Sequence, residues 1–409
     1  MKMRFPKKIG FMACLMLLCI FSMASAKIPV ILDTDIGDDI DDTWSLLTLL
    51  QSPEFDLKLV VTATGDTALR AKIVAKILEQ TGRTDIPIAV GKKTPDKFPT
   101  PFGKFSSHPY FQRSWIEDYD IKKYKGKIIE DGVDAMIQTI MHSKQQVVII
   151  AIGPLPNLAE ALKREPLIAE KSKIVGMLGS VYKGYSNSQK IAAEWNIATY
   201  IKDAQQVFAF AWPMTITPLD TCGVVKLQGE NYQKILHSNH PAAKTVIDSY
   251  RCWLNRPGEK PDERYSIDKG STVLYDTVAI YLALSEDLFK MEQIGLTVDG
   301  NGFTVIDPNA KKVKCAVEWK NIRMFEDFLV SRLTGEILPK RPPALSKKLR
   351  DQTLIPPHIN FKPGEKYLDE NRGFGMILGM ERTPEGRLWI SWIAGGDSEV
   401  GYALLAYSE

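Results

Sequence analysis

The feature that most constrains this chain is a dense acidic run placed directly after an apolar run. Six carboxylates stand within residues 33–42, and residues 28–32 before them are Ile-Pro-Val-Ile-Leu. The apolar run is typical of a buried parallel strand, and residues 43–50 are typical of a helix. Open α/β sheets bind their ligands at the carboxyl ends of strands, so the acidic run is expected to line a ligand site.

Burying these carboxylates together is costly, because like charges repel and each charge resists desolvation. A cation would relieve the repulsion, and hard oxygen ligands favour calcium or magnesium over zinc. The acidic run therefore predicts a cation site at the end of the first strand.

Short apolar runs alternate with amphipathic segments from residue 27 to about residue 333. Further strands are predicted at 57–64, 146–152, 174–178 and 214–218, and helices at 68–80, 155–162 and 275–284. This alternation predicts an α/β fold with a mostly parallel sheet that helices cover on both faces. Residues 95–124 and 255–270 lack this periodicity, and both are expected to form loops over one mouth of the sheet. His108 lies in the first loop; a lone loop histidine is ordinarily exposed, and folding over the site is the less favoured alternative.

The first 26 residues resemble a secretory signal, with a basic start, an apolar stretch at 9–23 and a small-residue site at 24–26. They predict export to a bacterial periplasm or beyond, with a short membrane anchor as the alternative.

The net charge of the whole chain is +3, and without these 26 residues, which carry four bases and no acid, it is −1. A near-neutral protein gives no electrostatic reason to expect nucleic-acid binding. No other stretch is long enough to span a bilayer, so no stable membrane insertion is expected after cleavage.

Three cysteines, Cys222, Cys252 and Cys315, follow the signal. An odd, widely spaced set is no disulfide framework, and three buried thiols are favoured over one pair. Nor does their spacing suggest a zinc site.

The tail after residue 333 differs in character from the rest. Residues 338–343 and 354–363 are proline-rich, and strands are predicted at 387–392 and 401–407. Segments 363–365, 372–374 and 385–392 resemble the first blade of a sialidase-like (BNR-repeat) β-propeller. One blade cannot close a propeller, so the tail is expected to belong to a truncated larger domain. The predicted organisation is a signal at 1–26, an α/β domain at 27–345, and a linker with a β segment at 346–409.

Asp33-Thr34-Asp35, Gly37 and the pair Asp41-Asp42 resemble the N-terminal signature of the inosine-uridine-preferring nucleoside hydrolase family, an Asp-x-Asp-Pro-Gly-x-Asp-Asp-Ala-type loop. This chain has Ile36 in place of the proline and two extra residues, Asp38 and Asp39, before the pair. Four further segments resemble the family in the right order: 65–72, 151–158, 193–197 and 275–279.

The resemblance implies a Rossmann-like α/β domain that hydrolyses the N-glycosidic bond of ribonucleosides, or of related ribosyl compounds, to free base and sugar. It also implies a bound Ca²⁺ whose ligands are Asp35, Asp42, Asp276 and the backbone carbonyl of Ile152. Asp35 is then the general base for the attacking water. The implied contacts with the sugar are Asp41, Glu194 and Asn196, with Asn187 and Asp66 as further candidates.

Tyr275 stands where members that cleave purine and pyrimidine nucleosides carry a histidine that helps the base to leave. A tyrosine can still donate a proton, but its ordinary pKa of about 10 makes it a weaker acid than imidazolium. The preferred base is therefore open.

Structural roles compete with these assignments. Asp41, Asp42 and Asp276 stand at helix starts, where a carboxylate caps free N–H groups without any metal. Asp33 is expected to be a structural cap, and Asp38 and Asp39 are expected to be solvated loop residues or outer contacts.

Two other functions remain open: a hydrolase of another glycoside or glycan, and a non-catalytic calcium-dependent sugar-binding protein. The expected partner is a small nucleoside or ribosyl compound, and a homo-oligomer is open by analogy with the family.

Overall fold

The computed structural model describes residues 26–99, 105–255, 264–336, 374–382, 388–395 and 402–407. The chain divides into two compact units, Met1–Leu338 and Pro339–Glu409. Residues 1–25 of the predicted signal and the proline-rich segments 338–343 and 354–363 lie outside the described residues. Within the described ranges, none of the helices has the length and apolar character that a membrane span requires.

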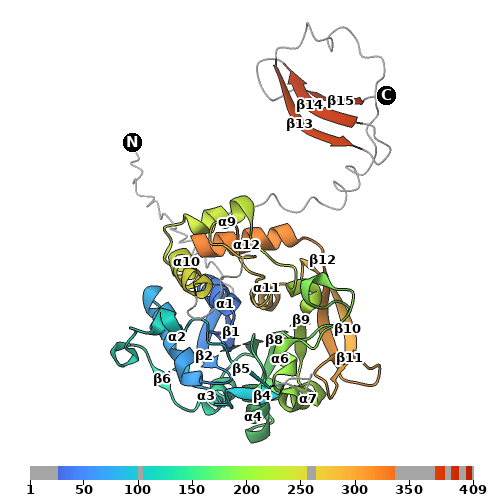
Figure 1. Ribbon diagram of the computed structural model, residues 1–409. Helices are drawn as coiled ribbons and strands as arrows, with labels where there is room; N and C mark the ends of the chain where they lie inside the picture. Colours follow the sequence, from blue (N-terminus) through green and yellow to red (C-terminus); the bar gives the residue numbers. More distant parts are fainter. Residues whose placement is uncertain are drawn as a thin grey trace, which may run out of the picture. The chain divides into compact units, whose positions relative to one another are not determined.

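A ten-stranded sheet forms the centre of the first unit (Figure 1). Its strands, in spatial order, are β11 (Thr304–Ile306), β10 (Phe289–Val298), β12 (Lys312–Trp319), β9 (Met214–Thr217), β8 (Ser172–Met177), β7 (Val147–Ala151), β1 (Ile28–Thr34), β2 (Phe55–Thr62), β3 (Ile88–Ala89) and β6 (Ile128–Ile129). Neighbours from β12 to β6 pair in parallel, and β10 pairs antiparallel with both β12 and β11. The predicted mostly parallel α/β sheet is therefore confirmed.

Helices cover both faces of this sheet, as Figure 1 shows for α9 to α12 on one side and α3, α4 and α7 on the other. One apolar core lies under α1 (Asp41–Leu50), α2 (Thr67–Gln80), α8 (Leu219–Cys222), α9 (Gly229–Leu236), α10 (Pro241–Leu254), α11 (Thr277–Leu284) and α12 (Ile322–Thr334). A second core lies under α3 (Gly132–Met141), α4 (Pro156–Arg164), α5 (Ile168–Lys171) and α7 (Ile201–Ala209). The short helix α6 (Trp195–Ala198) follows β8.

The central strands are continuous apolar runs in the sequence because an apolar core covers the sheet on each of its two faces. β1 is buried from Pro29 to Thr34, and all ten residues of α1 are buried. α1 begins at Asp41, two residues before the predicted start, and α11 begins at Thr277, two residues after it. Both shifts leave acidic side chains at a helix start.

The predicted loop at 95–124 contains a short antiparallel hairpin, β4 (Lys97–Pro99) and β5 (Phe105–Ser107), and two 3₁₀ turns, η1 (Arg113–Ile116) and η2 (Ile121–Lys123). A third turn, η3 (Tyr185–Asn187), follows β8. Cys222 and Cys315 are buried and Cys252 is partly buried, and all three thiols are free.

The second unit contains an antiparallel sheet of three strands, β13 (Phe374–Arg382), β14 (Leu388–Gly395) and β15 (Tyr402–Tyr407). The sequence predicted only the last two strands. β13 was missed because it contains two glycines and its pairing register shifts between Ile377 and Gly379, which breaks the alternation that marks a strand.

Candidate active site

A buried carboxylate cluster lies where β1 passes into α1. Ligand atoms of Asp41, Asp42 and Asp276 lie within 4.8 Å of one another, and all three residues are buried. Asp41 and Asp42 open α1, and Asp276 directly precedes α11. Segments more than 230 residues apart in the sequence thus meet because α1 and α11 begin at the same edge of the sheet.

A cavity of about 290 Å³ opens at this cluster. Its acidic lining consists of Asp35, Asp38, Asp39, Asp41, Asp42, Glu194 and Asp276. Its aromatic lining consists of Phe111, Tyr185, Trp195, Trp253 and Tyr275. Ile152, Met177, Pro109 and Asn196 complete the wall. A small chamber with acids at one part of its wall and flat rings at another suits a compact ligand that has both polar and aromatic parts.

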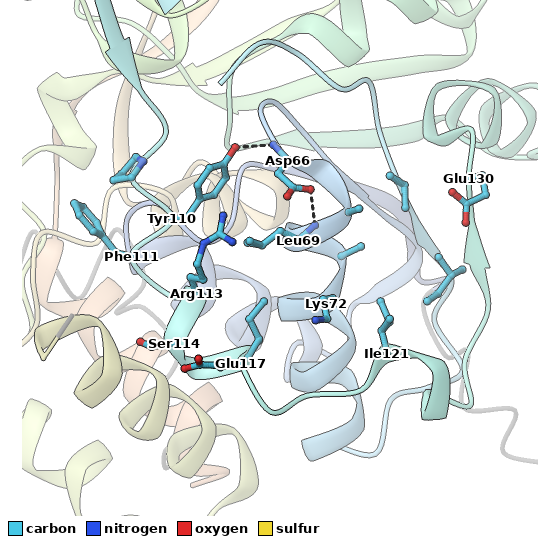
Figure 2. Close-up of a pocket in the computed structure, with 16 residues that line it drawn as sticks. Asp66, Leu69, Lys72, Tyr110, Phe111, Arg113, Ser114, Glu117, Ile121 and Glu130 are labelled. Carbon is cyan, nitrogen blue, oxygen red and sulfur yellow. Dashed lines mark hydrogen bonds between the residues drawn. The ribbon is translucent and has the colours of Figure 1, made fainter. Parts of the chain in front are cut away.

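Eight of the sequence-predicted site residues line this cavity: Asp35, Asp41, Asp42, Ile152, Glu194, Asn196, Tyr275 and Asp276. Two do not. Asp66 caps α2 by accepting a hydrogen bond from Leu69 N at 3.0 Å, and it lines a separate cavity of about 1120 Å³ (Figure 2). Asn187 lies in η3 and is exposed.

Local hydrogen bonds fix the carboxylates. The Thr34 hydroxyl donates to Asp42 Oδ1 and also accepts from Ile36 N at 3.1 Å, so the end of β1 and the start of α1 are joined. Asp41 Oδ2 accepts from Asp276 N at 3.3 Å. Asp33 does not line the cavity; its Oδ1 accepts from Asn157 Nδ2 at 2.7 Å.

Glu194 and Asn196 belong to the turn that starts α6. Glu194 accepts from Asn196 N at 2.8 Å and from Gly179 N at 2.9 Å, and thereby caps the helix. Asn196 Nδ2 donates to the Met177 carbonyl at 3.0 Å and to the Ile152 carbonyl at 3.4 Å. These bonds place both side chains at the carboxyl ends of β7 and β8.

Burial raises the pKa of five of the carboxyls that line the cavity. Desolvation is the largest cause, and it raises the pKa of Asp35 to about 6 and that of Glu194 to about 7. The pKa values of Asp41, Asp42 and Asp276 rise well above the ordinary value, because repulsion from neighbouring carboxylates adds to desolvation. A set of crowded, buried oxygen ligands fits a hard divalent cation, whose charge would favour the ionised forms.

Asp38 was expected to be a solvated loop residue or an outer contact, and the structure excludes the first alternative. Its carboxylate is buried, pairing with Arg70 Nη2 at 2.9 Å and with His108 Nδ1 at 2.8 Å. His108 is buried too, against the expectation for a loop histidine. The sequence held one signal for this network: Arg70 stands at helical spacing from the apolar Ile73 and Ile77, on the buried face of α2.

The family model for inosine-uridine preferring nucleoside hydrolases matches residues 30–332. The chain belongs to this family. It is an enzyme of the nucleoside hydrolase type, and the match covers the whole of the carboxylate cluster. The match ends before the tail, so the resemblance of residues 363–392 to a sialidase-like propeller gains no support from it.

The sequence identity between this nucleoside hydrolase family member and its relatives is low, but the similarity covers most of each relative's length. It is 25% identical over 300 residues to uridine nucleosidase 1 of Arabidopsis thaliana, covering 71% of this chain and 85% of the relative. It is 26% identical over 301 residues to the pyrimidine-specific ribonucleoside hydrolase RihA of Photobacterium profundum, covering 68% of this chain and 88% of the relative. A plant nucleoside hydrolase, PpNRh1, has a similar structure, with a TM-score of 0.63, 22% identity, and coverage of 76% of this chain and all of that chain.

Tyr275 is the main departure of this family member from the histidine implied by the resemblance. Its ring lies 6.1 Å from that of Tyr185 at an interplanar angle of 82°, an edge-to-face contact at the cavity wall. Burial raises the pKa of Tyr275 far above its ordinary value, so the phenol stays protonated and can donate a hydrogen bond.

Proposed function

We propose that this protein is a calcium-dependent nucleoside hydrolase, which cleaves the N-glycosidic bond of ribonucleosides to free base and sugar. The observation that carries the proposal is the buried cluster of Asp41, Asp42 and Asp276 at the wall of a 290 Å³ cavity. Family membership supports the reaction class, and the oxygen-only donor set supports calcium.

The proposed calcium ligands are Asp35, Asp42, Asp276 and the Ile152 carbonyl, all of which line the cavity. Asp41, whose carboxylate lies within 4.8 Å of those of Asp42 and Asp276, is the proposed contact for a ribose hydroxyl. A bound cation would orient a water molecule and lower its pKa.

Asp35 is the proposed general base. Its pKa of about 6 leaves it ionised at neutral pH but basic enough to accept a proton. It would take a proton from water while the water oxygen bonds to the anomeric carbon and the bond to the base nitrogen breaks. The positive charge that develops on the sugar is favoured by the surrounding carboxylates.

Glu194 and Asn196 are the proposed partners of the sugar hydroxyls. Backbone N–H groups hold the Glu194 carboxylate in place, so it is preorganised at the cavity wall. Tyr275 is the proposed donor to the departing base, whose nitrogen gains a proton in the reaction. Because a neutral phenol is a weak acid, we expect bases that leave readily to be preferred.

A hydrolase of another glycoside or glycan is the second candidate, and the tyrosine at position 275 favours it. The cavity argues against a long glycan, because about 290 Å³ is at the lower end of ligand-site volumes and holds one compact molecule. Export of the mature protein remains part of the proposal, based on residues 1–26.

The test is release of reducing sugar from a panel of nucleosides, in calcium and in chelator, by the wild type and by Asp35→Asn. Asp120→Asn is the matched control, because Asp120 is exposed, caps η2, a role that asparagine also fills, and otherwise pairs only with the exposed Lys123 at 3.9 Å. Chelator-sensitive release that Asp35→Asn loses and Asp120→Asn keeps supports the proposal. No release from any nucleoside despite bound calcium refutes it, and points to another glycoside or a binding protein.

A further inference from the structure

The carboxylate of Asp38 joins helix α2 to the loop that walls the cavity. Oδ2 accepts from Arg70 Nη2 at 2.9 Å and lies 2.8 Å from His108 Nδ1. Oδ1 accepts from Tyr110 N at 3.2 Å.

Arg70, which pairs with Asp38 from helix α2, is itself held firmly in place. Its side chain is fully buried, and it donates to the carbonyls of Thr64 at 2.9 Å, of Ile36 at 3.0 Å, and of Asp35. One guanidinium thus holds the ends of β1 and β2 together beside Asp38.

The backbone of Asp38 also holds a second aromatic residue of the cavity wall. Its carbonyl accepts from Trp253 Nε1 of α10 at 3.1 Å. Trp253 and Phe111 both line the cavity, and their rings meet edge to face at 6.0 Å. Asp38 therefore helps to fix two neighbouring aromatic side chains of the cavity wall, Phe111 through Tyr110 N and Trp253 through its own carbonyl.

Residues 109–111 separate two cavities. Pro109 and Phe111 line the 290 Å³ cavity and also the neighbouring cavity of about 1120 Å³. Figure 2 shows Tyr110 with its hydroxyl turned to Asp66, whose N–H donates to it at 2.6 Å. Tyr110 has a φ of 45°, unusual for a residue with a side chain, so outside contacts must hold this backbone in place.

We propose that Asp38 is a positioning residue that holds 109–111 as the partition between the two cavities, and thereby restricts the enzyme to compact nucleosides. That the substrate is a nucleoside rests on the proposed function. Without the carboxylate, Tyr110 N would lose its hydrogen-bond acceptor, and Arg70 would hold this segment only through its contact with the Tyr110 ring at 5.2 Å. The small cavity would then open towards the larger one.

The test uses Asp38→Ala and His108→Ala. The second variant leaves the Arg70–Asp38 ion pair in place, so it remains informative if burial of an unpaired guanidinium prevents Asp38→Ala from folding. Asp120→Asn is the control, because it removes a carboxylate from the same loop without touching the link.

The first readout, amide hydrogen exchange over 105–112, needs no activity. We expect exchange to be about tenfold faster in both link variants than in the wild type and Asp120→Asn. The second readout is kcat and KM for one nucleoside and for its 5′-O-benzoyl and base N-benzoyl derivatives. We expect KM for the parent to rise more than kcat falls, and kcat/KM for at least one derivative to rise about tenfold relative to the parent.

Unchanged exchange, or faster exchange with an unchanged preference for the parent nucleoside, overturns the proposal. A uniform loss of kcat for all three compounds also overturns it, because that is the mark of a merely structural role. If the wild type cleaves no nucleoside, the proposed function fails, and the exchange comparison still decides whether Asp38 holds the partition.

Discussion

Replacing Asp276 by asparagine should stabilise the metal-free protein and remove most of its response to calcium. The carboxylate of Asp276 lies within 4.8 Å of those of Asp41 and Asp42, and it caps no helix N–H. Two unit charges at 4.8 Å and an effective dielectric constant of about 20 repel by about 3.5 kcal/mol. Partial protonation, which the raised pKa values of these groups indicate, lowers the realised cost to about 2 kcal/mol.

The assay is thermal unfolding at pH 8 of wild type, Asp276→Asn and Asp120→Asn, each in chelator and in excess calcium. For a domain of more than 300 residues about 2 kcal/mol corresponds to a Tm rise of about 3 °C, which we expect for Asp276→Asn in chelator. Calcium at about 100 times its Kd should stabilise the wild type by about 2.7 kcal/mol, and Asp276→Asn far less, because a neutral amide replaces a charged ligand.

The wild type should therefore melt below the variant in chelator and gain more than the variant in calcium. Asp120→Asn should follow the wild type in both conditions, because its carboxylate is exposed and distant from the cluster. Two results would refute the reasoning: identical wild-type melts with and without calcium, or a lower Tm for Asp276→Asn in chelator.

Three further predictions follow from the same contacts. In chelator the free energy of unfolding should fall as pH rises from about 4 to 7, because burial raises the pKa of Asp33 and of Glu194 to about 7 and the folded state therefore binds more protons than the unfolded state; urea titrations that give a flat or rising profile would contradict this. Tyr275→Phe should lower kcat about 10-fold to 100-fold with little change in KM, measured on the best nucleoside, and an unchanged kcat would exclude the phenol as donor. Asp66→Ala should lower the free energy of unfolding by about 1 kcal/mol, because α2 loses its N-terminal cap, and an unchanged urea midpoint would show that this cap does not stabilise the fold.

The sequence predicted the sheet and half of the residues that line the cavity, from local pattern together with the resemblance to the family. Continuous apolar runs occur only where a strand is covered on both faces, and this holds for β1, β7 and β8. Parallel strands present their carboxyl ends at one edge, so acidic residues that follow β1 and precede α11 had to come together there. Position alone therefore predicted acidic residues at this edge, and the choice of Asp35, Asp42 and Asp276 among them came from the resemblance to the family.

Tertiary structure alone decided what happens to polar residues outside these positions. Nothing local distinguishes Asp38 from Asp39, yet Asp38 is buried against Arg70 and His108, which lie 32 and 70 residues away, while Asp39 is exposed. Asn187 and Glu194 are seven residues apart, yet only Glu194 reaches the cavity. Periodicity records whether a residue sits on an apolar face, and it does not record which distant partner will satisfy a buried charge. The fold and its cluster of acids were thus determined by sequence, and the partition that Asp38 holds was decided by long-range contacts.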